Sequence, residues 1–350
     1  MYDSAHTQSA GGILAKMLDP QGRLNVHAMR PFMDENGESR IVINAAGHTV
    51  RTNVPSLLRY DEFKDIDRVV LEVAVTRLVG IKRLIAKGLT HALGSIGLTI
   101  SLWDKSSDLT DASISMSGIT KGEEDTPAFE PAQVPVPIVH KDFRLNIRRL
   151  IASRMAGEGL DVMAPAMAAR KVAERSEDML FAGAAVQVDG STIYGYTTHP
   201  QRNTVDLVLN WDDPSATGQD IVDDVQAMLQ AARDDNYFGP FCLYVPGNYE
   251  GTLDNDFAFG SGDTRTVRQR IMQLSGISDI VVADRLADDN VVLVQETRDV
   301  ADLAIAEDIK TVQWQMDGGM QERFKVMAVW VPRIKSDYDG KSGIVHLAAI

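Results

Sequence analysis

Apolar side chains recur with a helical period between Asp61 and Gly88. Six of them lie three or four residues apart, as on one face of an amphipathic helix: Ile66, Val70, Ala74, Leu78, Ile81 and Ile85. Asp61 is a good N-cap, and Gly88 can stop the helix. We therefore predict a single helix over this segment.

A second helical region follows residue 146. Asn146 can cap a short helix over residues 147–155, and Asp161 can begin a longer helix that tolerates Pro165 in its first turns and stops at Gly183. The longer helix carries a face of mostly small residues: Ala164, Ala168, Val172, Ser176 and Met179. Small residues let neighbouring elements approach closely.

Residues 94–141 lie between these helices and contain short strand-like pieces at 98–103 and 112–117. The alternation of apolar and serine residues at 112–117 predicts a two-stranded ribbon around a tip rich in Gly, Glu, Asp and Pro. The prolines of residues 131–137 predict a stiff return. A long projecting ribbon is uncommon in a compact monomer, because its apolar residues find no partner.

Residues 212–308 alternate helix and strand patterns, which predicts an α/β layer. The expected helices cover residues 217–234 and 264–274, and the expected strands 241–245, 280–283 and 291–294, with a loop at 247–262.

The C-terminal part predicts a hairpin. Val312, Trp314 and Met316 alternate with polar residues, an Asp-Gly-Gly turn follows, and residues 323–331 run back. Residues 1–60, by contrast, are rich in Gly, Asn, Pro and Arg and lack long periodicity, so they predict an extended arm.

Charge separates one part of the chain from the rest. Residues 212–308 hold 20 acidic and 6 basic residues. Their net charge, 6 − 20 = −14, equals the formal net charge of the whole chain. This boundary supports a separate lobe and argues against nucleic acid as a specific ligand, because phosphate binding needs clustered Lys and Arg. An acidic lining suits a DNA container, and simple solubility explains it equally well.

Side chains that carry chemistry are scattered. The seven histidines show no metal-ligand spacing, and the single cysteine, Cys242, lies in an apolar run that predicts an inert thiol. Residues 260–264 could bind an anion ahead of a helix but lack the lysine of a P-loop. Asp104, Asp108 and Asp111 lack the spacing of a calcium loop. We predict no catalytic, cofactor-binding or metal-binding residue.

The longest apolar runs are too short to span a bilayer, and the N-terminus lacks the pattern of a secretory signal. These observations predict a protein that folds in the cytoplasm without membrane contact.

Residues 143–195 resemble the spine-helix region of tailed-bacteriophage major capsid proteins and encapsulins, which share the Hong Kong 97-like fold. The resemblance rests on Phe143-Arg144-Leu145, Gly159-Leu160-Asp161, the helix end from Ala173 to Gly183, and Ile193-Tyr194-Gly195. It implies an α+β fold, and the element order extends it over residues 57–350.

The resemblance also implies a division of the chain. The expected parts are an N-terminal arm at 1–60, a peripheral-domain helix at 61–93, an extended loop at 94–141, a peripheral domain with the spine helix at 142–211, an axial domain at 212–308 and a C-terminal hairpin at 309–350. The loop at 247–262 would lie near a hexamer or pentamer axis.

The implied function is structural rather than catalytic. We expect a major capsid protein that assembles in a bacterial cytoplasm, as hexamers and pentamers, into an icosahedral virion shell around DNA that it binds without sequence specificity. Scaffolding, portal and decoration proteins are expected partners. The alternatives are an encapsulin-type shell, which encloses cargo enzymes, and a soluble α/β metal-dependent hydrolase. The 60-residue arm and the long ribbon favour the viral capsid.

Some related capsids form a lysine–asparagine crosslink between the extended loop and the late peripheral domain. Lys105 and Lys121 could supply the amine, but Asn290 is the last asparagine, and the C-terminal hairpin contains none. We therefore predict that no such crosslink forms.

Overall fold

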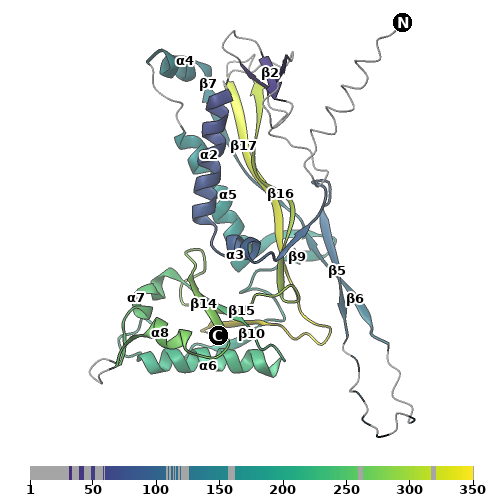
Figure 1. Ribbon diagram of the computed structural model, residues 1–350, viewed down its shortest axis with the longest axis vertical. Coiled ribbons are helices and arrows are strands. Elements are labelled where there is room, and N and C mark those ends of the chain that lie inside the picture. The colour runs from purple at the N-terminus through teal and green to yellow at the C-terminus, as the bar shows by residue number, and fades with distance from the viewer. Residues whose placement is uncertain are drawn as a thin grey trace.

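Figure 1 shows a tall body, a lobe at its lower end and a ribbon that projects beside the lobe in this computed structural model. The structure describes residues 31–33, 39–42, 49–51, 58, 60–107, 109, 112, 114, 116, 119, 126–156, 162–258, 263–316 and 321–349.

The first predicted helix is two helices, α2 (Tyr60–Arg77) and α3 (Gly80–Ala86). The prediction of a single helix was therefore wrong. Because the chain is interrupted after α2, the phase of the apolar stripe changes in α3. Leu84 is buried there, whereas Ile85, which the sequence placed on the buried face, is exposed.

A buried carboxylate explains the interruption. Glu177 accepts hydrogen bonds from the main-chain N–H groups of Val79, Gly80 and Ile81, at 2.9, 3.1 and 3.0 Å. These are N–H groups that have no partner within α3, so the side chain of another helix caps it. Gly80 also packs too closely against Leu180 to allow a larger residue.

The second helical region contains α4 (Ile147–Ala156) and α5 (Met163–Phe181). The side chain of Asn146 accepts a hydrogen bond from the N–H of Arg148 at 2.9 Å, as predicted for a cap. The N-cap of α5 is Val162, without a side-chain bond, rather than the predicted Asp161, which lies outside the described residues. Gly183, at φ +79°, follows α5 in the expected left-handed conformation.

The body contains a four-stranded sheet in the order β4-β16-β17-β7. Its strands are β4 (Thr90–Ala92), β7 (Ile138–Asn146), β16 (Ala301–Met316) and β17 (Gln321–Ile334). The last two form the predicted C-terminal hairpin. We call this sheet, together with α2, α3 and α5, the hairpin body.

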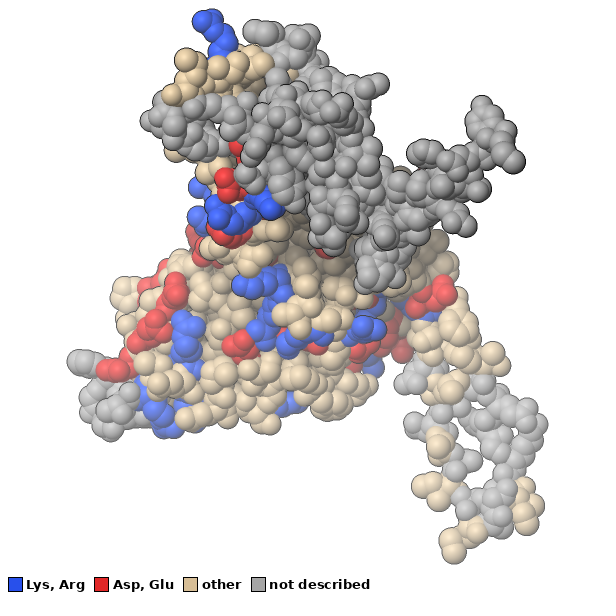
Figure 2. Space-filling model, turned by 45° about the horizontal axis from the view of Figure 1, so that its top comes forward, with Lys and Arg blue, Asp and Glu red and all other residues tan. Residues whose placement is uncertain are grey.

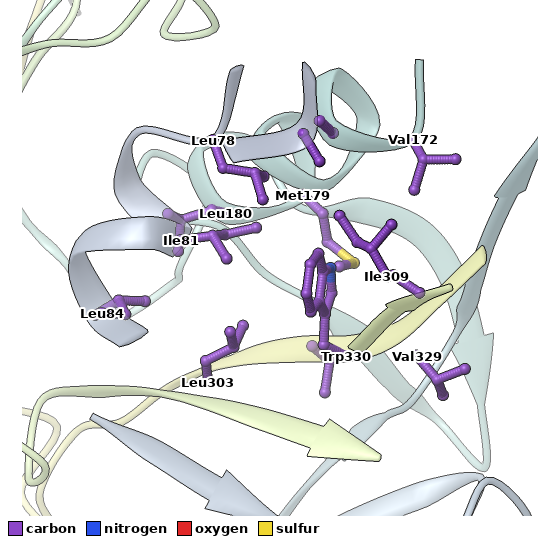
Figure 3. Packing of buried hydrophobic residues seen from close by; sticks show 14 of the residues in the cluster. Leu78, Ile81, Leu84, Val172, Met179, Leu180, Leu303, Ile309, Val329 and Trp330 are labelled. Carbon is purple, nitrogen blue, oxygen red and sulfur yellow. The ribbon is translucent and has the colours of Figure 1, made fainter. Parts of the chain in front are cut away.

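The core of the hairpin body lies between its sheet and the helices, and Trp330 is central to it (Figure 3). The indole N–H donates to Ser176 Oγ at 3.0 Å, so this buried polar group is paired. Ser176 belongs to the predicted small-residue face of α5, and Ala168, Val172 and Met179 of that face are buried as well.

The ribbon consists of β5 (Ile100–Ser106) and β6 (Phe129–Pro135). The sequence had predicted 112–117 as the partner strand and 131–137 as a return. Of residues 112–117, only Ala112, Ile114 and Met116 are described, and none is in a strand. Pro131 and Pro135 are tolerated because they lie on the same edge of β6, which has no partner strand in the described chain, so their missing N–H groups break no ladder hydrogen bond.

The lobe is built on a five-stranded sheet in the order β10-β18-β15-β11-β14. Its strands are β10 (Asn203–Asp206), β11 (Phe241–Val245), β14 (Ile277–Val282), β15 (Val291–Gln295) and β18 (Ile344–Ala348). We call it, with its helices, the α6 lobe. Its strands β10 and β18 lie outside residues 212–308, so segments distant in sequence complete this sheet.

Helix α6 (Gly218–Asp234) covers the lobe sheet and begins at a capping box of Thr217 and Asp220. The predicted loop at 247–262 contains a 3-10 turn, η2 (Gly247–Tyr249), and the short helix α7 (Glu250–Leu253). The predicted helix 264–274 is shorter, α8 (Val267–Met272), because Thr266 and Gln269 form a capping box there. Strands β12 (Asp256–Ala258) and β13 (Asp263–Thr266) precede it.

Two short sheets complete the described chain. Strands β8 (Ala184–Val188) and β9 (Ser191–Ile193) form a hairpin after α5. Strands β1 (Pro31–Met33), β2 (Ser39–Val42) and β3 (Thr49–Arg51) form an antiparallel sheet within the segment predicted as an arm.

Candidate assembly surfaces

The ribbon exposes apolar side chains that its own chain does not cover. Leu102 and Phe129 are each 66% exposed, and three residues of the connecting segment are almost fully exposed: Ile114, Met116 and Ile119. We call these five residues the ribbon surface. An apolar group of this size favours a protein partner over water.

A buried ion pair fixes the base of the ribbon. Arg333 of β17 donates to both carboxylate oxygens of Asp302, at 2.6 and 2.5 Å, and its guanidinium lies 5.8 Å from the ring centre of Trp103 on β5. Lys335 donates to Asp302 at 2.8 Å. Burial alone would raise the pKa of Asp302, but the hydrogen bonds from the two cations hold that pKa below its ordinary value. The ribbon therefore projects from a rigid base.

Helices α2 and α5 present a second apolar surface. Leu71, Val75, Met163 and Met167 are 49–68% exposed. Met167 also lines a groove between the two helices, whose lining residues are Glu72, Val73, Thr76, Arg77, Ala166, Met167 and Arg170. This surface is independent of the ribbon, which lies on another part of the molecule (Figure 1).

Charged side chains join the hairpin body to the α6 lobe. Glu296 follows β15, is 5% exposed, and receives Arg83 at 2.6 Å and Lys87 at 2.5 Å from the region of α3. The hydroxyl of Tyr244 donates to the same carboxylate at 2.8 Å. Because the buried carboxylate is met by two cations and a hydroxyl, its charge is compensated.

A second connection lies at the surface. Arg285 donates to both carboxylate oxygens of Asp178 on α5, at 2.6 and 2.9 Å. Figure 2 shows basic and acidic residues side by side over the visible face of the molecule, whereas the described part of the ribbon is mostly uncharged. The first connection thus joins the lobe to the region of α3, and the second joins it to α5.

Two histidines that are far apart in sequence lie on either side of Arg202. The guanidinium donates to His346 Nδ1 at 3.2 Å and to the carbonyl oxygen of His199 at 2.9 Å. Burial, reinforced by nearby cations, lowers the pKa of both histidines to about 4. They are therefore neutral at pH 7.

The remaining residues singled out in the sequence do not converge. Cys242 is fully buried, and burial raises the pKa of its thiol. Lys105 is half-buried beside Gln201, and Asp104 is exposed, whereas Lys121, Asp108, Asp111 and residues 260–262 lie outside the described part of the chain. Asp263 and Thr264 are in β13 rather than at a helix start.

Among the described residues, no three His, Cys, Asp or Glu side chains are grouped so that they could hold a metal ion. In the same part of the chain, no helix is long and apolar enough to cross a membrane.

Residues 52–347 match the model of a protein family described as a family of unknown function, DUF6260. The match covers most of the chain. The protein belongs to this family.

A relative with an assigned role is the type 1 encapsulin shell protein EncA of Myxococcus xanthus (strain DK1622). It is 27% identical over 282 residues, which cover 79% of this chain and 90% of the relative.

Solved structures show the same fold. A virus-like particle from Pyrococcus furiosus has a TM-score of 0.60 at 17% identity and covers 81% of this chain and 98% of its own. The capsid of Myoviridae phage XM1 has a TM-score of 0.55 at 12% identity and covers 78% and 93%. These comparisons confirm the predicted α+β Hong Kong 97-like fold.

Proposed function

We propose that this protein assembles with copies of itself into a closed icosahedral shell of the encapsulin type. One observation carries the choice of type: the sequence relative that spans 79% of the chain at 27% identity is an encapsulin shell protein, whereas the phage XM1 capsid is 12% identical. The 60-residue arm and the long ribbon favoured a viral capsid from sequence alone, and this remains the second candidate.

The ribbon surface supports self-assembly. Contact of its five apolar residues with water is unfavourable. Burying them against a second copy therefore stabilises the assembled state after each subunit has folded. Many identical copies repeat the contact, and a closed arrangement satisfies it in every subunit.

The expected division of the chain is part of the proposal. The hairpin body would form the peripheral domain, the ribbon the extended loop, and the α6 lobe the axial domain. Residues 247–262 would then lie near a five-fold or six-fold axis. The acidic residues of the α6 lobe would repel the phosphates of nucleic acid, so nucleic acid would not be retained on the surface of the lobe.

The first experiment is electron microscopy of the full chain, expressed alone and purified by size-exclusion chromatography. Closed particles of uniform size that contain protein and little nucleic acid support the encapsulin type. Particles that require a scaffolding protein, or that retain DNA, favour the viral capsid. Small oligomers that never form shells, in any buffer or with a co-expressed scaffold, contradict both.

A deletion tests the role of the ribbon. Replacing residues 106–130 by a short Gly-Ser turn should leave a folded subunit with an unchanged far-ultraviolet circular dichroism spectrum but without particles. Normal shells from this variant would contradict the proposed mechanism.

A further inference from the structure

A cavity of about 410 Å³ lies where the ribbon meets the rest of the subunit. One wall is the base of β5 and β6, and the other walls are the β8–β9 hairpin, residues 199–201 and the end of β17 (Figure 1). Segments that are distant in sequence therefore form it together. Its volume lies within the range of small-molecule sites in proteins.

The register of the ribbon decides which of its side chains face this cavity. Trp103 pairs with Ala132, and Lys105 pairs with Glu130, so these four side chains lie on one face of the ribbon. Val134, two residues further along the same face, is only 4% exposed, so this face packs against the subunit. Trp103, Lys105 and Ala132 line the cavity.

Aromatic rings form part of the lining, and their neighbours hold them in place. The guanidinium of Arg333 lies 5.8 Å from the ring centre of Trp103, and Arg333 is fixed in turn by its ion pair with Asp302. The ring of Tyr194 stands edge-on to that of His199, with the ring centres 5.9 Å apart. The cavity is therefore preformed, and its rings suit a flat apolar ligand.

One charged side chain, Lys105, is present in the described lining. Its ammonium group donates to Oε1 of Gln201 at 3.3 Å. Among the described residues it forms no ion pair, although Glu130 lies opposite it on β6, and none of the described residues that line the cavity is Asp or Glu. A half-buried ammonium group without a counter-ion favours an anion beside it.

His199, which also lines the cavity, does not compensate this charge with one of its own. Burial, followed by the charges of Lys105 and Arg202, lowers the pKa of the ring to about 4, so the ring is neutral at pH 7. Nδ1 accepts the N–H of Gln201 at 3.3 Å, which leaves the proton of the neutral ring on Nε2. The described lining thus contains an ammonium group and an imidazole N–H, and no carboxylate.

We propose that this cavity binds a small aromatic carboxylate, with its ring against Trp103 and Tyr194 and its carboxylate on the ammonium group of Lys105. A cation would be repelled by Lys105. A phosphate ester would favour the bidentate fork of an arginine over one lysine. This inference goes beyond the proposed shell function and does not depend on it, because one subunit contains the whole cavity.

Isothermal titration calorimetry of dissociated subunits with 2-naphthoate tests the binding. We expect one molecule per subunit with a Kd between about 10 µM and 1 mM, because so small a ligand has few atoms to contribute affinity. 2-Naphthamide has the same ring without the charge and should bind at least about tenfold more weakly. No saturable binding of 2-naphthoate, or equal affinity for the amide, would overturn the proposal.

Substitution of Lys105 locates the carboxylate. Lys105→Met removes the ammonium group and keeps the length of the side chain, so it should weaken 2-naphthoate binding by at least about tenfold and change 2-naphthamide binding by less than about twofold. Lys325→Met, on β17 outside the cavity, is the matched control and should bind both probes like the wild type. Unchanged affinity of Lys105→Met for 2-naphthoate would overturn the proposed site.

Ala132→Leu tests the cavity itself. The larger side chain occupies the space beside Trp103, so both probes should bind at least about tenfold more weakly, and denaturant unfolding verifies that the variant is folded. Inorganic phosphate in about tenfold excess should not displace 2-naphthoate. Displacement would show a general anion site and overturn the ligand class. Because binding is measured on dissociated subunits and particles are scored by electron microscopy, either proposal can fail while the other stands.

Discussion

The strands of the α6 lobe bury their apolar side chains within the subunit, whereas the strands of the ribbon leave large apolar side chains exposed. Every residue of β11 and β15 is buried, and the two faces of β11 belong to different cores: Leu243 faces α6, whereas Tyr244 faces the hairpin body. On the ribbon, Leu102 and Phe129 remain 66% exposed. The lobe is thus stabilised by its own chain, and the ribbon keeps apolar surface for another copy. The difference separates folding from assembly within one subunit.

Leu243→Ala should give the largest effect on folding. The side chain is fully buried in the lobe core, so its removal leaves a cavity, and we expect the free energy of unfolding to fall by about 2–5 kcal/mol. Denaturant unfolding of dissociated subunits measures it. The matched change Leu102→Ala on the ribbon should cost less than about 0.5 kcal/mol. Equal losses at the two positions would remove the distinction between the regions.

Acid should destabilise both regions through one histidine each. His199 lines a cavity beside the ribbon base, and His346 is on β18 of the lobe. Their pKa of about 4 in the folded state lies below the ordinary value of 6.5. As the pH falls from 6.5 to 4, the unfolded chain binds protons that the folded chain does not. The free energy of unfolding should fall by roughly 3 kcal/mol for each histidine.

Single substitutions assign this acid sensitivity. His346→Gln can keep both hydrogen bonds of the ring without titrating, so it should remove the roughly 3 kcal/mol that this histidine contributes to the difference between unfolding at pH 7 and at pH 4.5. His199→Gln should remove a similar part. His140→Gln, at an exposed position on β7, should leave the difference unchanged. An unchanged pH dependence in the two buried variants would show that other groups cause it.

The sequence predicted elements whose cause is local. Thr217 and Asp220 cap α6, Asn146 caps α4, and the alternation around Trp314 marks the C-terminal hairpin. These signals lie within a few residues of the structures that they set. The fold class followed because the order of such elements resembles a known fold.

Features that depend on distant residues were missed. The break after α2 is made by Glu177, about one hundred positions away, and the sheet of the α6 lobe recruits β10 and β18 from outside the acidic segment. The partner of β5 was misplaced because serine alternation at 112–117 looked like a strand, whereas the prolines of β6 argued against one. The available signal was the spacing of Pro131, Pro135 and Pro137, which all have odd numbers.

Replacing ribbon residues should have the smallest effect on subunit stability and a large effect on assembly. Leu102→Ser and Phe129→Ser remove side chains that are already mostly hydrated, so we expect the free energy of unfolding of dissociated subunits to change by less than about 0.5 kcal/mol each. The combined variant should nevertheless fail to form particles at concentrations where the wild type assembles, because burial against a neighbour is lost in every copy. Light scattering and electron microscopy follow assembly, and Ser106→Ala, an exposed polar change on the same strand, is the control. If the combined variant assembled normally, the ribbon's apolar residues would have no role in the shell. If instead it lost several kcal/mol of subunit stability, the ribbon would be part of the folding core, and the contrast with the α6 lobe would be wrong.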